Sequence, residues 1–395
     1  MEQEALFAQN TDHFFIRIFK HCKSFLRIIF VIINNVYCIP TYVVWMMMLY
    51  PVKRYNPDLY FRIEGLFFHW LLAMVAMWSW SAGYDIVEMG DDIRVCLEER
   101  TLVLANHQST ADVPLLMATF NAKKNILPHL MWIMDSVFKY TNFGIVSVLH
   151  EDFFIVSGRN RREESLQALV KHLHNSFIPR QRKWIVLFPE GGFLRKRRLT
   201  SQRYAEKNNL PILKNVSLPR VGAMRVIMEN IGYPTDGNSM GDGEESELVR
   251  NQLQGNGQES KEELPMKPEE NDAGPSGYFS YNNSPFASDS KKIRWLLDIT
   301  IAYPQGVPLD LPTIVTGSRP PCQTFLFYRL YKCSQIPVDK DEMTNWLYQI
   351  FQEKDEMLEK FYATGVFPKN EFSQSPAPNR FVVQDNLRDR FLTIV

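Results

Sequence analysis

Residues 101–112, TLVLANHQSTAD, join a short apolar run to a polar block. The segment 101–106 is apolar and bounded by turn-forming residues, which predicts a buried β-strand. His107 and Asp112 follow at the point where this strand would give way to a helix. The sequence therefore places two titratable side chains at the end of a strand.

A second junction of the same kind lies further along the chain. Residues 184–192 read WIVLFPEGG, in which the apolar run predicts a strand and Pro-Glu-Gly-Gly predicts a tight corner. Further strands are expected at 143–149, 152–156, 299–303 and 324–331, with a charged helix over 159–175. Strands that alternate with helices predict an α/β fold with a central sheet flanked by helices.

Two long apolar stretches precede this region. Residues 28–52 and 66–84 contain no Lys, Arg, Asp or Glu, and each is long enough to cross a hydrocarbon core of about 30 Å. We therefore expect a basic segment over 1–27 and two membrane helices within 28–84. Polar residues and a proline interrupt the stretches, so buried helices of a soluble protein remain an alternative. A spanning hairpin with both ends cytosolic is preferred over two half-embedded helices.

The balance of charge is uneven along the chain. The 395 residues carry 44 basic and 44 acidic side chains, but 12 acidic and only 3 basic ones fall within 233–290. The remainder has 41 basic against 32 acidic residues, a net charge of +9 that suits anionic lipid surfaces or phosphorylated substrates. Nothing in this balance favours nucleic acid. The five cysteines lack metal-binding or disulfide-scaffold spacing and fit a reducing compartment, and no metal is expected.

The segment 233–290 interrupts the α/β pattern. It is rich in Gly, Asn, Ser, Pro and Glu and almost without apolar periodicity, which predicts a disordered acidic insertion. Strand patterns resume afterwards, so 85–232 and 291–335 are expected to form one domain. A C-terminal helical segment is expected over 336–368, with an amphipathic helix at 341–362 that Gly365 ends, and a loose tail over 369–395.

His107 and Asp112 have the chemistry of a general base and its partner. Asp112 can accept a hydrogen bond from the imidazole and fix its tautomer, while Ser109 or Thr110 can cap the following helix. No serine or cysteine is placed as an obvious nucleophile, so direct attack by a substrate hydroxyl is the simpler chemistry. Taken alone, the spacing is equally typical of a capping aspartate beside a surface histidine.

The Pro-Glu-Gly-Gly corner adds a carboxylate, Glu190, at the sheet edge where α/β proteins bind ligands. Alone it is an ordinary turn at the end of a strand. Because both polar blocks follow predicted strands, with Asp112 and Glu190 78 positions apart, we interpret them as one site.

The chain resembles the glycerolipid acyltransferases that use acyl-CoA, which carry an N-H-x4-D block followed by F-P-E-G. The resemblance runs from about residue 28 to residue 368. It implies an acyltransferase-type α/β fold, in which His107 is the catalytic base and Asp112 its orienting partner. It also implies that Glu190 and Gly191 help to bind the glycerol-phosphate part of the acceptor.

The resemblance extends to weaker blocks. Lys139 and Gly144 match a helix-turn that lines the acceptor side. The second family block, G-x-x-F-I-x-R, is matched at 154–155, but Glu151 replaces the glycine and Ser157 the arginine. Arg159, two residues later, is the candidate for the missing phosphate contact.

Two further basic sites complete the candidate set. Arg220, in the triplet Leu-Pro-Arg of the fourth block, could meet a phosphate. The run 195–198, which Arg195 opens, is either a solvated face or a landing surface for CoA phosphates or anionic headgroups.

The resemblance implies an acyl-CoA-dependent enzyme that acylates a hydroxyl of a lysophospholipid such as lysophosphatidylglycerol. Acyl-CoA is then a co-substrate and no cofactor is bound. The enzyme is expected in the endoplasmic reticulum membrane with its catalytic domain in the cytosol. Another lysolipid acceptor such as lysophosphatidylethanolamine or lysocardiolipin, a CoA-independent transacylase, and a catalytically silent membrane scaffold remain alternatives.

Overall fold

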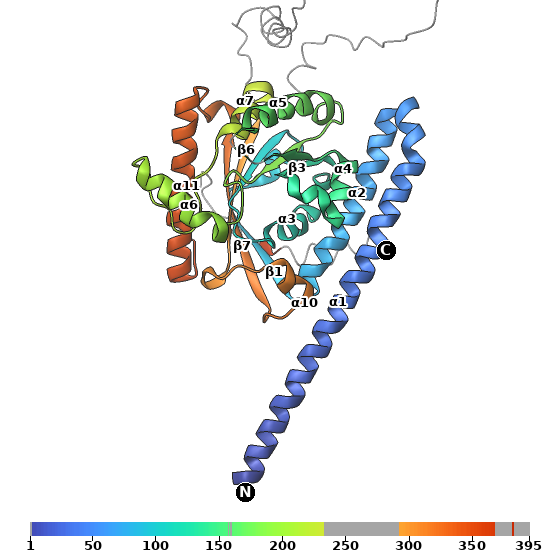
Figure 1. Ribbon diagram of the computed structural model, residues 1–395, viewed down its shortest axis with the longest axis vertical. Coiled ribbons are helices and arrows are strands. Elements are labelled where there is room, and N and C mark those ends of the chain that lie inside the picture. The colour runs from blue at the N-terminus through green and yellow to red at the C-terminus, as the bar shows by residue number, and fades with distance from the viewer. Residues whose placement is uncertain (1, 157, 159, 233–291, 368–380, 383–395) are drawn as a thin grey trace, which may run out of the picture. The chain divides into compact units, whose positions relative to one another are not determined.

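A mixed eight-stranded sheet forms the centre of the computed structural model (Figure 1), which describes residues 2–156, 158, 160–232, 292–367 and 381–382. The strand order is β4-β3-β5-β2-β6-β7-β1-β8. The strands are β1 (Tyr84–Gly90), β2 (Thr101–Ala105), β3 (Leu130–Asp135), β4 (Phe153–Ile155), β5 (Trp184–Leu187), β6 (Trp295–Ala302), β7 (Cys322–Lys332) and β8 (Phe381–Val382). Neighbours from β4 to β6 run parallel, whereas β7 is antiparallel to β6.

Helices cover both faces of the sheet (Figure 1). The α-helices are α1 (Glu2–Tyr55), α2 (Pro57–Trp80), α3 (Asp112–Asn121), α4 (Asn142–His150), α5 (Arg162–His172), α6 (Leu194–Lys207), α7 (Gly222–Ile231), α10 (Leu311–Thr316) and α11 (Lys340–Thr364). Alternate side chains of β2 face opposite layers, with Val103 toward α2 and α3, and Leu102 toward α5, α7 and α11. Burial on both faces explains why β2 is apolar throughout.

The predicted α/β architecture is confirmed, with one strand assignment wrong. The segments 101–106, 152–156, 184–188, 299–303 and 324–331 contain or overlap β2, β4, β5, β6 and β7. The segment 143–149, however, lies in α4. The Thr141 side chain caps this helix by accepting a 3.0 Å hydrogen bond from the Gly144 N–H, and Glu151 ends it in the left-handed conformation (φ 62°). The strands β1, β3 and β8 were not predicted.

The two N-terminal apolar stretches fall in a helical hairpin. They lie mainly in α1 and α2, both long and apolar enough to cross a membrane, and α2 ends before Tyr84, which begins β1. Half of the most apolar part of α2 is buried. The buried side chains extend from Tyr60 to Ser79, so the body covers one face of α2 along its length.

A buried carboxylate fastens α2 to the rest of the molecule. Glu64 is 1% exposed and accepts hydrogen bonds of 2.6 Å from Tyr42 of α1, from the Arg180 guanidinium and from His150 Nδ1. Glu64 and His150 are 86 residues apart in the sequence, so the folded chain alone brings them together. The same histidine stacks on Phe68, with ring centroids 3.4 Å apart.

The described residues that flank the predicted insertion lie next to each other in the fold. The Ile293 N–H donates to the Ile231 carbonyl at 2.6 Å, so the end of α7 and the segment leading into β6 are adjacent. The insertion 233–290 and the tail 369–395 lie outside the described residues, apart from β8 in the tail. The C-terminal helix is confirmed as α11, and Gly365 ends it at φ 75°.

Candidate active site

Three neighbouring parallel strands deliver the polar residues of the site. The strands β5, β2 and β6 lie side by side, so their carboxyl ends meet at one edge of the sheet. His107 follows β2, Glu190 follows β5 and Tyr303 follows β6. Asn106 extends the pairing of β2 with β6, because its side chain exchanges hydrogen bonds of 3.0 and 2.7 Å with the main chain of Ile301.

Asp112 holds the imidazole of His107 from a fully buried position. Its Oδ2 accepts from His107 Nδ1 at 2.9 Å, and its Oδ1 accepts from the Tyr303 hydroxyl at 2.5 Å. Burial, and next the Asp112 carboxylate, raise the pKa of Tyr303 well above its usual value, so the phenol keeps its proton and donates. The three side chains form a hydrogen-bonded chain from Tyr303 through Asp112 to His107.

The loop before α3 is arranged differently from the predicted cap. Ala111 is the N-cap residue and makes no side-chain bond, while Asp112 begins the helix. The Ser109 N–H donates to Asp112 Oδ2 at 2.9 Å, and Ser109 Oγ accepts from the Ala111 N–H. Thr110 Oγ1 accepts from Leu311 at 2.9 Å. These side chains therefore fix the loop rather than cap α3, and they leave Asp112 at the positive end of the helix dipole.

Two phenylalanines enclose the His107 ring. Phe188 stacks on it with centroids 4.1 Å apart, and Phe193 lies 4.4 Å away at a tilt of 53°. The residue is 9% exposed. Since Nδ1 faces Asp112, the fixed tautomer presents Nε2 as the atom that can accept a proton from a substrate.

Glu190 supports the backbone of the site. Its Oε1 accepts from the His107 N–H and its Oε2 from the Ser217 N–H, both at 2.7 Å, and the residue is 2% exposed. Burial raises the pKa of Glu190 to about 8, against the effect of the two N–H donors, which favour the ionised form. The family resemblance implies that this carboxylate binds the acceptor, but both of its oxygens accept from main-chain N–H groups. This arrangement positions His107.

A cluster of arginines surrounds the glycines of the corner. A Cβ on Gly191 (φ 67°) would lie 3.2 Å from the Arg220 guanidinium, and Arg197 donates to the Gly191 carbonyl at 2.7 Å. The pKa of Arg220 is lowered by partial burial and by the nearby guanidiniums of Arg197 and Arg162. Three positive groups that repel one another beside an exposed glycine turn are suited to an anion such as a phosphate.

Of the other predicted binding residues, the structure describes Lys139 and Arg195. Lys139 belongs to the 3-10 helix η3 (Ser136–Tyr140), and its Nζ lies 5.0 Å from the ring centre of Phe154 in the edge strand β4. Arg195 is exposed on α6. Arg159 lies outside the described residues. Glu151, which replaces the family glycine, forms an ion pair of 2.9 Å with Lys53.

Sequence reasoning missed three residues that support the site. Tyr303 and Ser217 contact Asp112 and Glu190, as described above. Asp355 of α11 accepts hydrogen bonds of 2.5–3.2 Å from three consecutive N–H groups, 214–216, and so holds the loop that carries Ser217. The position of Tyr303 at the end of a predicted strand was the one available signal. In the described part of the chain, no group of three or more His, Cys, Asp or Glu side chains is placed to hold a metal.

Comparison with known proteins agrees with this geometry. The family model "Acyltransferase" matches residues 87–229, which include His107, Asp112 and Glu190, and "Acyltransferase C-terminus" matches residues 314–392. The chain is 40% identical over 365 residues to the human acyl-CoA:lysophosphatidylglycerol acyltransferase 1, covering 92% of this chain and 88% of that protein. The chain belongs to the acyltransferase family.

Two other comparisons are more distant. This acyltransferase is 28% identical to the Caenorhabditis elegans putative 1-acyl-sn-glycerol-3-phosphate acyltransferase acl-12, over 82% of this chain and 73% of the relative. The crystal structure of the 1-acyl-sn-glycerophosphate acyltransferase PlsC from Thermotoga maritima matches with a TM-score of 0.34 and 12% identity, covering 83% of this chain and 97% of that one.

Proposed function

We propose that this acyltransferase moves a fatty acyl group from acyl-CoA to a free hydroxyl of a lysophospholipid, with lysophosphatidylglycerol as the first acceptor to test. The His107–Asp112–Tyr303 chain carries the proposal, because it presents one imidazole nitrogen of fixed tautomer at a sheet edge. This acceptor is the one in the name of the human relative, which is 40% identical over most of its length.

The geometry supports a direct transfer. His107 Nε2 takes the proton of the lysolipid hydroxyl while the hydroxyl oxygen attacks the thioester carbonyl carbon. Asp112 holds the imidazolium that results. When the tetrahedral intermediate collapses, the C–S bond breaks and the thiolate of CoA takes the proton back from His107. The products are the diacyl phospholipid and free CoA, and His107 returns to its starting form.

The arginine cluster is the proposed contact for the acceptor's phosphate. Arg220 and Arg197 lie against Gly191 at the corner next to His107 and Phe188. Arg195, which lies two residues before Arg197 on α6, is the proposed contact for phosphates of CoA. Glu190 has no part in this binding and acts by holding the main chain of His107.

The apolar helices α1 and α2 suggest that the protein associates with a membrane. Of the two arrangements left open by the sequence, half-embedding fits better. A spanning α2 would carry α3 and the buried Glu64 network into the hydrocarbon, because the body covers one face of α2 along its length. We therefore place the hairpin in one leaflet of the endoplasmic reticulum, with the body in the cytosol. The free cysteines are compatible with that reducing compartment.

The test is a direct assay of the purified protein in nanodiscs. Release of CoA is measured with palmitoyl- and oleoyl-CoA against lysophosphatidylglycerol, lysophosphatidylethanolamine and lysocardiolipin. CoA release that requires both lysolipid and His107 supports the proposal. Acyl transfer between phospholipids without CoA would identify a transacylase, and a complete lack of transfer with every acceptor would leave a scaffold.

A further inference from the structure

A short segment beside the sheet edge exposes an unusual amount of apolar surface. The elements η3 and α4 carry a single charged side chain before the helix ends, that of Lys139. Five large apolar residues are exposed there: Val137 (70%), Phe138 (42%), Tyr140 (92%), Ile145 (50%) and Val148 (49%). We call these five residues the η3–α4 face. Contiguous apolar surface of this kind marks an interaction site in soluble proteins.

The face is held rigidly. A Cβ on Gly144 would lie only 2.1 Å from the Phe138 carbonyl, so α4 approaches η3 as closely as a glycine allows. The other side of α4 is anchored, since Val146 is fully buried in the core that contains α2 and α3. The exposed side chains therefore stay outside because their helix is fixed by packing on its inner side.

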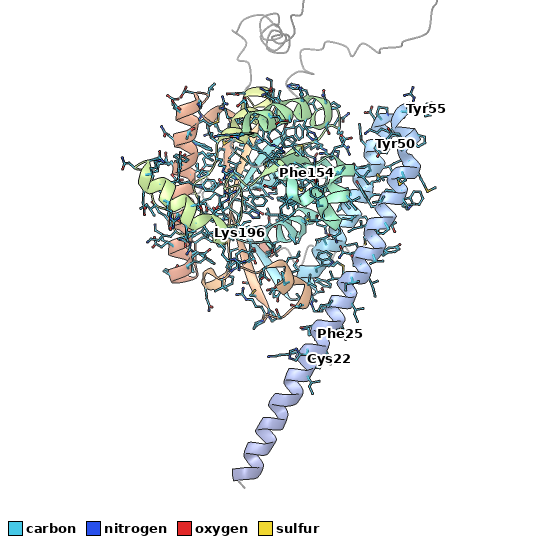
Figure 2. All side chains as sticks on the ribbon, viewed as in Figure 1. Cys22, Phe25, Tyr50, Tyr55, Phe154 and Lys196 are labelled. Atoms are coloured by element: carbon cyan, nitrogen blue, oxygen red, sulfur yellow. The ribbon has the colours of Figure 1, made fainter. Side chains whose placement is uncertain are left out.

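The face continues the apolar surface of α1. At one end of α4, Asn142 donates to Asn35 of α1 at 3.1 Å, and just past the other end Glu151 pairs with Lys53 at 2.9 Å. Between these contacts α1 exposes large apolar residues, among them Val36 (68%), Tyr37 (62%), Met47 (68%), Met48 (67%) and Tyr50 (67%). Figure 1 shows α4 on the side of the sheet that carries the hairpin, and Figure 2 labels Tyr50 near the end of α1.

The face also adjoins the charged rim of the active site. Asp135, which caps η3 by accepting from the Val137 N–H at 3.0 Å, acts electrostatically on Arg220. Arg220 in turn lies against Gly191. Apolar side chains therefore lead from α1 through η3 to the guanidiniums of Arg220, Arg197 and Arg162, which is the order of surfaces that an anionic lipid with its acyl chain would meet.

We propose that the η3–α4 face is a second bilayer contact, which inserts beside α1 and brings the lipid headgroups to Arg220. The inference rests on the proposed attachment of α1 to the membrane and adds a surface from the catalytic body itself. Its consequence is that a lysolipid reaches His107 laterally from the bilayer, without first leaving it. A second copy of the chain is the other occupant that such a face could take.

The first experiment measures insertion at three positions. In a Cys22→Ser parent, which removes the exposed cysteine of α1 (Figure 2), Tyr140→Cys, Met47→Cys and Val338→Cys are each labelled with an environment-sensitive fluorophore. Val338 is 65% exposed just before α11 and serves as the control outside the face. We expect doxyl lipids in nanodiscs to quench the labels at positions 140 and 47 at least threefold more than the label at 338.

The outcomes separate this inference from the proposal it rests on. Quenching at 47 without quenching at 140 would overturn the η3–α4 contact and leave the attachment by α1 intact. An absence of quenching at both positions would overturn the attachment as well. A label at 140 that is shielded by self-association, seen as a dimer in light scattering with no lipid quenching, would assign the face to a second copy of the chain.

The second experiment measures the consequence for turnover. Tyr140→Ser and Ile145→Ser change exposed side chains and leave His107, Asp112 and Glu190 untouched. We expect the double variant to raise the apparent KM for lysolipid in anionic vesicles about fivefold, with kcat for a monomeric short-chain lysolipid unchanged. Val338→Ser is the matched control and should alter neither value. Equal behaviour of the double variant and the control on vesicles would contradict the proposal.

Discussion

The Tyr303 hydroxyl lies 2.5 Å from Asp112 Oδ1, on the opposite oxygen from the one that bonds His107. Asp112 therefore shares its charge between a neutral phenol and the catalytic imidazole. A carboxylate that is bonded on both sides cannot rotate away from His107, and its negative charge is partly neutralised. Tyr303 is in this sense a positioning residue that acts through Asp112.

Replacing the phenol tests this role. Tyr303→Phe should lower kcat roughly 10-fold, a part of the ~10²–10⁴-fold that general-base assistance contributes, with little change in KM. The acid limb of the kcat profile should move to higher pH, because Asp112 then concentrates its charge on the imidazolium form of His107. The substitution leaves two neighbouring groups unchanged. Glu190 still accepts from the His107 N–H, and Tyr362 of α11 still interacts electrostatically with Asp112.

Tyr328→Phe is the matched control. Tyr328 is also buried and donates to a carboxylate, Glu88, at 2.7 Å, but it lies in β7 away from the site. Both variants should lose similar thermal stability. Equal pH profiles for the two variants would show that Tyr303 only supports packing.

Replacing the base or its orienting partner should lower activity without affecting folding. His107→Ala and Asp112→Asn should each lower kcat at least ~100-fold. The first substitution removes the base. The second introduces an amide whose NH₂ can donate to the imidazole and favour the wrong tautomer. The measurement is initial CoA release at saturating acyl-CoA and lysolipid, with expression and nanodisc incorporation as controls. If His107→Ala kept about a tenth of wild-type kcat, the base would have to lie elsewhere.

The local part of the site was predictable, and the tertiary part was not. His107 and Asp112 are five positions apart at the end of an apolar strand, so their pairing follows from local geometry. Tyr303 lies 191 residues from Asp112, and a tyrosine at a strand end is normally part of the core. The occupation of Glu190 by Ser217 depends equally on a loop whose position only the folded chain defines.

The lack of a deciding local signal also explains the wrong strand prediction. The segment 143–149 is a short apolar run like the true strands, and such a run has no period that distinguishes a buried strand from a buried helix. The decisive signals are single residues at its ends, the Thr141 cap and the left-handed Glu151. By contrast, α11 has a clear helical periodicity over 25 residues, and it was predicted almost to its ends.

Glu190→Gln distinguishes a positioning role from acceptor binding. Each oxygen of Glu190 accepts from one N–H group, that of His107 or that of Ser217, whereas an amide must turn its NH₂ toward one of the two. We expect a stability loss of about 1–3 kcal/mol from one unsatisfied buried N–H. Activity assays should show a lower kcat with an almost unchanged KM for the lysolipid. A rise in KM alone would restore the acceptor contact implied by the family resemblance.

The same pair of proteins gives a pH test. Because the pKa of Glu190 is raised to about 8 in the fold, its neutral form is favoured there, and its stabilising contribution is present below its unfolded value and lost as pH rises through 8. The Tm of the wild type should therefore fall relative to that of Glu190→Gln between about pH 5 and 8.5. A constant difference in Tm would mean that the two N–H donors keep Glu190 ionised throughout.

The acidic insertion should be dispensable for folding and turnover. The Ile293 N–H bonds the Ile231 carbonyl, so a short linker can join the chain across 233–290 without moving α7 or β6. A Gly/Ser replacement should leave expression and CoA release within a few-fold of wild type, because a segment of such composition buries little apolar surface. Loss of folded protein would show that the segment contributes to the core.

The attachment of α2 to the body should depend on Glu64. Glu64→Gln leaves Arg180 with a weaker buried partner, and breaking a buried ion pair costs roughly 3–5 kcal/mol. The exposed pair of Glu99 with Arg294, 3.3 Å apart, is the control, since such pairs contribute about 0–1 kcal/mol and Glu99→Gln should change the Tm little. Hydrogen exchange in nanodiscs should then show faster exchange of α2 amides in Glu64→Gln alone. Equal Tm values and equal exchange in the two variants would mean that apolar packing, rather than the Glu64 network, fastens α2.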